Sequence, residues 1–192
     1  MRELRIQYNA PVVLTFSLLA LGALLLGMVT DGSSTWMLFS VYRSPLTQPL
    51  TYLRFFTHVL GHANYAHFIN NIMLLLVIGP PMEEKYGSRR LLACIVLTAF
   101  ASGLVQFIFF PGTALLGASG IVFMMIVLSS LSGMRDGAIP LTLILVVVLY
   151  LGGEVVDAVS SQDDVSQLTH IVGGLCGGAF GLTVGRTHGK RK

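Results

Sequence analysis

Residues 91–110 read LLACIVLTAFASGLVQFIFF, twenty consecutive positions without a charged side chain. A helix needs roughly 20 mostly apolar residues to cross the hydrocarbon core of a bilayer. This stretch therefore predicts a membrane-spanning helix, and we expect the rest of the fold to be organised around it.

The composition of the whole chain points the same way. Of its 192 residues, 54% are hydrophobic and only 11% are charged, more apolar surface than a soluble domain of this size could bury. The two cysteines, Cys94 and Cys176, both lie in apolar runs and indicate neither a disulfide framework nor a zinc site. The length fits a single domain.

Similar apolar stretches recur along the chain. They predict an all-α membrane protein, a single domain over residues 1–192, with six spans at about residues 12–29, 67–82, 91–110, 117–133, 138–153 and 168–185. Arg2 and Arg5 precede the first stretch, as in a signal peptide. Its apolar core is too long for that, and no small-x-small cleavage site follows, so we expect a retained span.

Basic residues predict the orientation, because loops on the cytoplasmic side carry an excess of lysine and arginine. In the six-span scheme only Arg43 and Arg54 fall on one side, and the other ten of the 12 basic residues fall on the opposite side. Both termini are therefore predicted to be cytoplasmic. The same asymmetry explains the basic pI of about 9.1, so no nucleic-acid partner is predicted.

The connection at about residues 30–64 is too apolar for a fully solvated loop and is expected in the outer interface.

Strongly polar residues inside a membrane are costly and by default mark function. Four stand out: His67 and Asn71 at the start of the second span, Ser119 at the start of the fourth, and His170 at the start of the sixth. We read the second span as opening with His58 and His62, a pair four residues apart that shares one helical face. With a cytoplasmic N-terminus, the pair His67 and Asn71, Ser119 and His170 all lie at similar depth near the outer face.

These residue types suit acyl transfer. A serine hydroxyl becomes a nucleophile when a neighbouring imidazole takes its proton, so Ser119 and His170 form a candidate dyad. His67, Asn71 and the backbone amide of Ser119 could donate to a developing oxyanion. Gly117 allows a tight turn beside the serine. Small residues at four-residue spacing would let the sixth span approach the fourth closely, namely Gly173, Gly177 and Gly181.

Each signal has a plainer interpretation. A lone Gly117-Ala118-Ser119-Gly120 is common in membrane helices, the glycine rows more often mean packing, and His170 could bond to a neighbouring carbonyl. Glu83 is most simply a surface or capping carboxylate. The His58/His62/His67 group leaves open a small transporter or a metal-binding membrane protein, although no third ligand with a proper spacing is obvious.

The joint pattern resembles the rhomboid protease family over roughly residues 50–185. The stretch from Arg54 to Asn71 is similar to its histidine-rich second-span signature. Gly117-Ala118-Ser119-Gly120 resembles its G-x-S-G, and His170 with Gly173 resembles its last-span H-x-x-G.

This resemblance implies Ser119 as nucleophile and His170 as general base, with His67, Asn71 and the Ser119 amide as the oxyanion site. It also implies supporting roles for His62 in the water network, for Arg54 in holding the first loop, and for Glu83. The family implies cleavage of transmembrane helices of other proteins near the outer interface, without metal or cofactor. The compact chain favours the bacterial inner membrane, and a homo-oligomer stays open.

Three further expectations follow. Phe123 stands one turn after Ser119 where many bacterial members carry a tyrosine, and Leu53 stands where an aromatic residue is frequent, but neither change touches the dyad. The fifth span, with Pro140 near its start and Gly152-Gly153 at its end, is the expected gate for a substrate helix. A non-catalytic protein that binds membrane helices is the rival interpretation.

Overall fold

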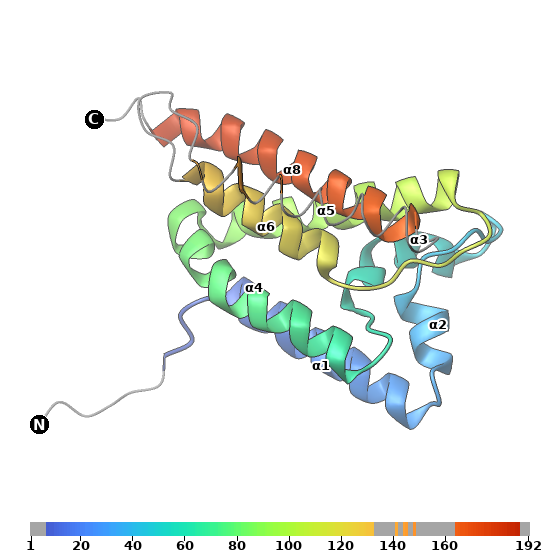
Figure 1. The fold of residues 1–192 in the computed structure, drawn as a ribbon. Helices are drawn as coiled ribbons and strands as arrows, with labels where there is room; N and C mark the ends of the chain where they lie inside the picture. The colour runs from blue at the N-terminus through green and yellow to red at the C-terminus, as the bar shows by residue number, and fades with distance from the viewer. Residues whose placement is uncertain (1–6, 133–140, 142–143, 146–147, 149–163, 189–192) are drawn as a thin grey trace, which may run out of the picture.

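The computed structural model describes residues 7–132, 141, 144, 145, 148 and 164–188. Every regular element named within these residues is helical (Figure 1). The elements are α1 (Pro11–Val29), α2 (Ser33–Phe39), α3 (Pro49–Thr57), the 3-10 turn η1 (His58–Leu60), α4 (Tyr65–Tyr86), α5 (Ser88–Phe109), α6 (Ser119–Ser132) and α8 (Asp164–His188). The predicted span at 138–153, with its gate residues Pro140 and Gly152-Gly153, lies almost wholly outside the described residues.

Three helices of the described part, α1, α4 and α5, are both long enough and apolar enough to cross a bilayer, and α6 is a shorter apolar helix of 14 residues. The chain is therefore an integral membrane protein built from helices. The observed helices run past several predicted limits: α4 extends to Tyr86 through Pro80 and Pro81, and α5 begins at Ser88. Charged residues had excluded these turns from the predicted spans, yet a helix can continue beyond the hydrocarbon core.

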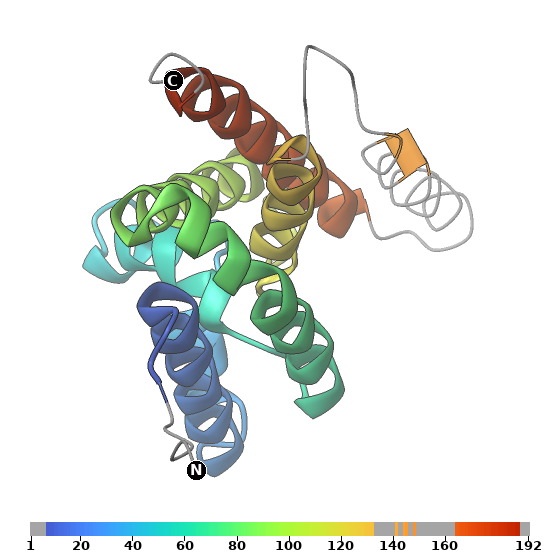
Figure 2. The same ribbon diagram turned by 90° about the vertical axis from the view of Figure 1, so that its left-hand side faces the viewer.

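The ends of the helices lie in two groups, as Figures 1 and 2 show. α1 and α5 begin at one end of the bundle, where α4, α6 and α8 finish. The starts of α4, α6 and α8 lie together at the other end. We call the first the α1/α5 end and the second the α4/α6/α8 end. The predicted second, fourth and sixth spans thus begin on the same side.

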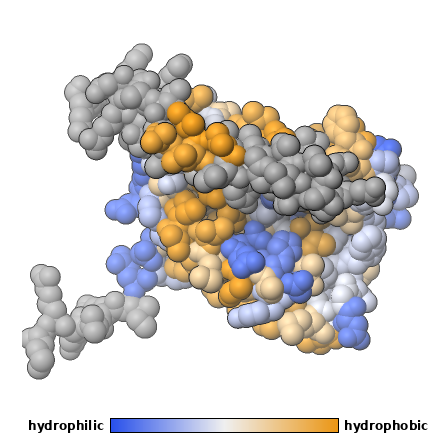
Figure 3. Space-filling model, viewed as in Figure 1, coloured by the Kyte–Doolittle hydropathy of each residue, from blue (hydrophilic) through white to orange (hydrophobic). Residues whose placement is uncertain are grey.

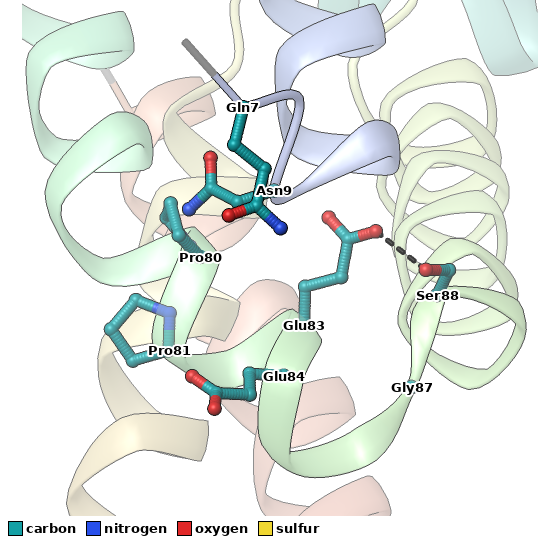
Figure 4. Close-up of a pocket in the computed structure, with 8 residues that line it drawn as sticks. All are labelled: Gln7, Asn9, Pro80, Pro81, Glu83, Glu84, Gly87 and Ser88. Carbon is teal, nitrogen blue, oxygen red and sulfur yellow. Dashed lines mark hydrogen bonds between the residues drawn. The ribbon is translucent and has the colours of Figure 1, made fainter. Parts of the chain in front are cut away.

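A buried carboxylate fixes the start of α1. Glu83 is only 3% exposed, and its two oxygens accept the backbone N–H groups of Val12 and Val13, each at 3.0 Å. The Ser88 hydroxyl donates to the same carboxylate at 2.7 Å (Figure 4). Amides in the first turn of a helix have no partner within it, so Glu83 caps α1 and joins it to α4 and α5. Of the two predicted roles, surface or capping, the structure shows the capping one.

The connection between α1 and α4 is itself helical, with α2 and α3 inside it. Buried Arg54 joins these two helices: its Nε donates to the carbonyl of Met37 at 2.8 Å, and its guanidinium lies over the Tyr42 ring at 4.4 Å. Val41 and Leu115 exchange two backbone hydrogen bonds of 2.9 Å. This bridge ties the connection to the loop that leads into α6.

Apolar side chains cover much of the outer surface. Figure 3 shows them over a broad part of one face, with hydrophilic residues towards both ends of the bundle and in a patch near the middle. Many large hydrophobic residues are exposed on the helices, among them Leu18, Met28, Met73, Val77 and Leu97. Such a surface suits contact with lipid rather than water.

Candidate active site

Asn64 sets the position of His67 at the start of α4. Its side-chain oxygen accepts the backbone N–H of His67 at 2.8 Å, which satisfies one of the unpaired amides of the first turn. Asn71 follows one turn later on the same face, and its side-chain NH2 donates to the His67 carbonyl at 2.9 Å. The predicted pairing of His67 with Asn71 on one helical face is therefore confirmed.

The interpretation of His58 and His62 as the opening of the same helix is wrong. His58 lies in η1 and His62 in the link that follows. The reason is Gly61, where any Cβ would collide with the backbone of Phe39 at the end of α2. The chain must pass close to α2 in extended form here, so no continuous helix can present the two histidines on one face.

Both of these histidines are held in fixed environments that precede the span. The His58 Nδ1–H donates to the carbonyl of Arg54 at 3.0 Å, and its Nε2 lies 3.3 Å from the Ser102 hydroxyl oxygen. The His62 Nδ1–H donates to the Leu60 carbonyl at 3.1 Å. Burial lowers the pKa of His58 to about 4. Burial and then the neighbouring His67 lower the pKa of His62 to about 4. Both rings are therefore neutral at physiological pH.

Ser119 is the first residue of α6, and Gly117 shapes the approach to it. Gly117 has a φ of 123°, a backbone conformation that L side chains rarely adopt. A Cβ at this position would lie 2.8 Å from two atoms of the His67 ring. The His67 imidazole thus packs directly on the Gly117 backbone, two residues before the serine. The Gly117 N–H also donates to the His58 carbonyl at 2.9 Å.

The glycine row of α8 packs against α6, as the four-residue spacing predicts. A Cβ on Gly173 would collide with the backbone of Gly120, one on Gly177 with the backbone of Met124, and one on Gly181 would lie 3.0 Å from Leu131. Figures 1 and 2 show the two helices side by side. The prediction that these glycines allow close approach of the last span to the fourth is confirmed.

This packing brings His170 beside the start of α6. A Cβ on Gly120 would lie 3.0 Å from a side-chain carbon of Thr169, the residue before His170. His170 is 8% exposed, and its ring centroid lies 6.1 Å from that of Phe123 at an angle of 54°. Ser119 and His170 therefore occupy adjacent turns of two helices that touch.

Two polar residues of α5 that support the site were not predicted from the sequence. Ser102 lies against the His58 ring, and the Gln106 side chain donates to the Thr113 carbonyl at 3.1 Å and to its hydroxyl at 3.0 Å. Both are buried, and Gln106 holds the loop that leads towards Ser119. With Thr98 they repeat every four residues in an otherwise apolar span, and this pattern could have identified them.

Within the described part of the chain, no group of three or more His, Cys, Asp or Glu residues lies close enough together to hold a metal ion. His62 and His67 are neighbours, with ring centroids 5.0 Å apart. His58 already has a polar group at each ring nitrogen. Among the residues that the structure describes, the metal interpretation has no third ligand.

A cavity of about 460 Å³ lies beside the site. Its walls come from the end of α1, from α2, from the link that carries His62 and Asn64, and from Leu116 in the loop before Ser119.

Comparison with known proteins identifies the family of the chain. Residues 49–187 match the rhomboid domain model. Rhomboid-related protein 2 of Mus musculus is 28% identical over 72% of the chain and 53% of its own length. The rhomboid protease GlpG of Pectobacterium atrosepticum is 27% identical over 89% of the chain and 62% of its own length. GlpG of Enterobacter sp. strain 638 is 34% identical over 43% of the chain and 30% of its own length.

The chain thus spans between 30% and 62% of the length of these relatives. The matched domain nevertheless covers well over half of the chain itself and includes every residue of the candidate site. The chain belongs to the rhomboid family.

Proposed function

We propose that this chain is a serine endopeptidase that cleaves transmembrane segments of other membrane proteins near the outer face. The observation that carries the proposal is the meeting of three helix starts at the α4/α6/α8 end. There the His67 ring packs on Gly117, and Thr169 packs on Gly120. Residues far apart in the sequence thus surround Ser119.

In the proposed mechanism the Ser119 hydroxyl oxygen attacks the scissile carbonyl carbon while His170 accepts the hydroxyl proton. His170 then donates that proton to the leaving amine, and the peptide C–N bond breaks. A water molecule, activated by the same imidazole, attacks the acyl-enzyme and releases Ser119. No carboxylate is needed in this scheme, because packing of α8 on α6 can orient the imidazole.

Three donors serve the oxyanion that forms during each attack. The Ser119 amide lies in the first turn of α6, where backbone N–H groups have no partner within the helix. The side-chain NH2 of Asn71 has two hydrogens, and only one is required for its bond to the His67 carbonyl. The His67 imidazole supplies the third donor from its position on Gly117. Fixed donors of this kind supply much of the rate enhancement in acyl transfer.

The topology that goes with this function has six spans with both termini in the cytoplasm, in a bacterial inner membrane. A substrate helix reaches the site from the lipid after its end unwinds, with the span at 138–153 as gate. Unwinding exposes peptide groups that lipid cannot solvate, so segments with poor helix formers are preferred. The cavity beside His62 and Asn64 then receives a substrate side chain. No cofactor or nucleic acid takes part, and a homo-oligomer is compatible with this scheme.

The decisive experiment compares Ser119→Ala with Ser129→Ala, the same change ten residues further along α6. Purified protein is given a single-span substrate in vesicles, and a fluorophosphonate probe reports the reactive serine. We expect cleavage and labelling to disappear in Ser119→Ala and in His170→Ala, and to persist in Ser129→Ala. Cleavage by Ser119→Ala at the parent rate would reject the proposed nucleophile. Intact folding without labelling of the parent chain would favour the non-catalytic, helix-binding interpretation.

A further inference from the structure

The cavity beside the candidate active site carries a negative charge, and we call it the Asp31 cavity. Among the described residues that line its volume of about 460 Å³, Asp31 is the one with a charged side chain. His62 lines it too, but its ring is neutral because burial and then the neighbouring His67 lower its pKa to about 4. Within the part of the chain that the structure describes, the Asp31 carboxylate has no hydrogen-bond or ion-pair partner. Its charge is therefore available to a cation from another molecule.

A tight turn between α1 and α2 brings Asp31 and Trp36 to this cavity. Asp31 has a φ of 47° and Gly32 a φ of 81°, both in the left-handed region, and aspartate is one of the few residues besides glycine that adopt it readily. The Gly32 N–H donates to the Gly27 carbonyl at 2.8 Å, which closes the end of α1. α2 begins one residue later at Ser33, so Trp36 in its first turn lines the same cavity as Asp31.

Trp36 adds an aromatic surface to the cavity. It is the one tryptophan of the chain, and it is 55% exposed. One face of its ring stacks on Tyr42, with centroids 4.6 Å apart at an angle of 14°, so its other face and its edge are left for the cavity. Tryptophan is the best aromatic partner for a cation. The same segment already pairs a ring with a cation, because the Arg54 guanidinium lies over Tyr42 at 4.4 Å.

Much of the remaining wall is apolar, with Leu24 and Met28 from α1 and Leu116 from the loop before Ser119. Lysine and arginine side chains combine an apolar stem with a charged end. Such a stem fits between the apolar walls while its charged end pairs with Asp31 and Trp36. A leucine in the same place would leave the Asp31 charge unpaired, and a glutamate would be repelled by it.

The Asp31 cavity lies within a few residues of the proposed reaction centre. Leu116 stands three residues before Ser119, so their Cα atoms are at most about 11 Å apart. An extended peptide advances about 3.3 Å per residue. A substrate side chain that enters the cavity therefore comes from a residue within about four positions of the bond that Ser119 attacks.

We propose that the Asp31 cavity selects substrates that carry a lysine or arginine within about four residues of the scissile bond. This inference rests on the proposed peptidase function and names the class of substrate for it. In the proposed topology the basic residue stands at the outer end of the substrate span. Basic residues are scarce on that side of membrane proteins, because they gather in cytoplasmic loops. A preference for one therefore narrows the range of substrates.

The test is cleavage of matched single-span substrates by the purified full chain in vesicles. The scissile bond is first located from the masses of the products, and arginine, leucine or glutamate is then placed in turn at each position near it, on either side. At one position we expect arginine to give a kcat/KM about tenfold above that of leucine, with glutamate below both. One exposed ion pair and one cation–π contact together account for about this factor. High salt should reduce it.

Variants of the cavity assign the preference to its residues. Asparagine also tolerates the left-handed conformation, so Asp31→Asn removes the charge and keeps the turn, and the arginine-to-leucine ratio should fall at least about threefold. Asp31→Lys should reverse the order of the arginine and glutamate substrates. Trp36→Leu should lower the ratio about threefold, and Trp36→Phe, which keeps a ring, should lower it less. Glu84→Gln removes an exposed carboxylate at the α1/α5 end and is the matched control, in which the ratio should not change.

A binding measurement separates this inference from the peptidase proposal. Fluorescent single-span peptides with arginine or leucine at the outer end are titrated against Ser119→Ala, with and without Asp31→Asn. The arginine peptide should bind more tightly, and the difference should shrink when Asp31→Asn is added. This binding preference without any cleavage by the parent chain would reject the peptidase and keep the cavity as a site for basic side chains. Cleavage in which arginine is no better than leucine at any position, equal binding of the two peptides, or an unchanged ratio in Asp31→Asn would overturn the inference and leave the peptidase proposal standing.

Discussion

The two ends of the bundle both bury polar side chains, but they treat them differently. At the α1/α5 end, the Glu83 carboxylate accepts three hydrogen bonds, from two backbone amides and a hydroxyl. At the α4/α6/α8 end, the buried His62 Nε2 has no hydrogen-bond partner among the described residues, and one hydrogen of the Asn71 amide is left for a ligand. Fully satisfied buried groups usually stabilise a fold, whereas partly satisfied ones require another explanation.

This difference separates stability from activity in the molecule. The buried Glu83 carboxylate at the α1/α5 end is engaged within the chain, so its replacement should lower the free energy of unfolding. Polar groups at the α4/α6/α8 end are partly unused, so changes there should lower turnover and leave the fold almost intact. Four substitutions test this division.

Asn71→Ala should have the largest effect on turnover. Removing one oxyanion donor typically costs about 10²–10³-fold in kcat, less than loss of Ser119 because the Ser119 amide and His67 remain. Thermal unfolding should change little, since Asn71 bonds only to a carbonyl of its own helix. Asn70→Ala, an exposed neighbour, is the control. Parent-like kcat in Asn71→Ala would remove Asn71 from the proposed site.

Glu83→Gln should show the opposite behaviour. Hydrogen bonds to charged groups contribute about 1.5–3 kcal/mol each. A glutamine side chain can accept hydrogen bonds only at its oxygen, so part of this network is lost. We therefore expect the free energy of unfolding to fall by roughly 3 kcal/mol. Turnover per folded molecule should stay within a few-fold of the parent. The matched control is Glu84→Gln, because Glu84 is exposed and adjacent. Equal stability of the two variants, measured by denaturant titration, would contradict the capping role.

Gly177→Ala should lower the free energy of unfolding by a smaller amount. It alters the contact between α6 and α8, the helices that carry Ser119 and His170. A methyl group there would collide with the Met124 backbone, whereas Gly178 has nothing within 4 Å of its added Cβ. Overpacking costs typically about 1–3 kcal/mol, while alanine in an open helical position gains up to about 1 kcal/mol over glycine. Gly177→Ala should therefore unfold more easily than the parent and Gly178→Ala should not. Reversal of this order would mean that α8 does not pack on α6 through this row.

Apolar length alone was enough to predict α1, α4 and α5, because each crosses a bilayer-sized distance with few charges. Spacing was enough to predict that the glycines of α8 would allow close approach to α6. The helices inside the 30–64 connection were not predicted, because their support comes from distant partners such as the Met37 carbonyl that Arg54 reaches and the Leu115 backbone opposite Val41. The helices α4 and α5 run beyond the predicted spans, because charged residues limit the part of a helix that crosses the hydrocarbon core but not the helix itself.

The site was predicted in its members but not in all of its local structure. The spacing of His58 and His62 suggests one helical face, yet the close passage of Gly61 against Phe39 prevents a helix there. The turn predicted at Gly117 is present, with a φ of 123°, and α6 begins at Ser119, two residues after the start of the predicted fourth span. Steric requirements of this kind depend on what lies opposite a glycine, and only the folded chain reveals the neighbour.

Phe123→Tyr should have the smallest effect on kcat. It tests what orients the His170 imidazole at the α4/α6/α8 end. Phe123 packs against both Gly174 and the His170 ring, so the aromatic ring already limits rotation of the imidazole without a hydroxyl. Adding the hydroxyl should change kcat by less than about tenfold, the size expected for a single peripheral hydrogen bond. Phe123→Leu removes the ring face itself and should slow turnover more than Phe123→Tyr changes it. The kcat values of the three proteins, measured against the same substrate at equal folded fraction, decide whether ring packing or a hydrogen bond holds His170 in place. A far faster tyrosine variant would show that packing alone leaves the imidazole poorly oriented.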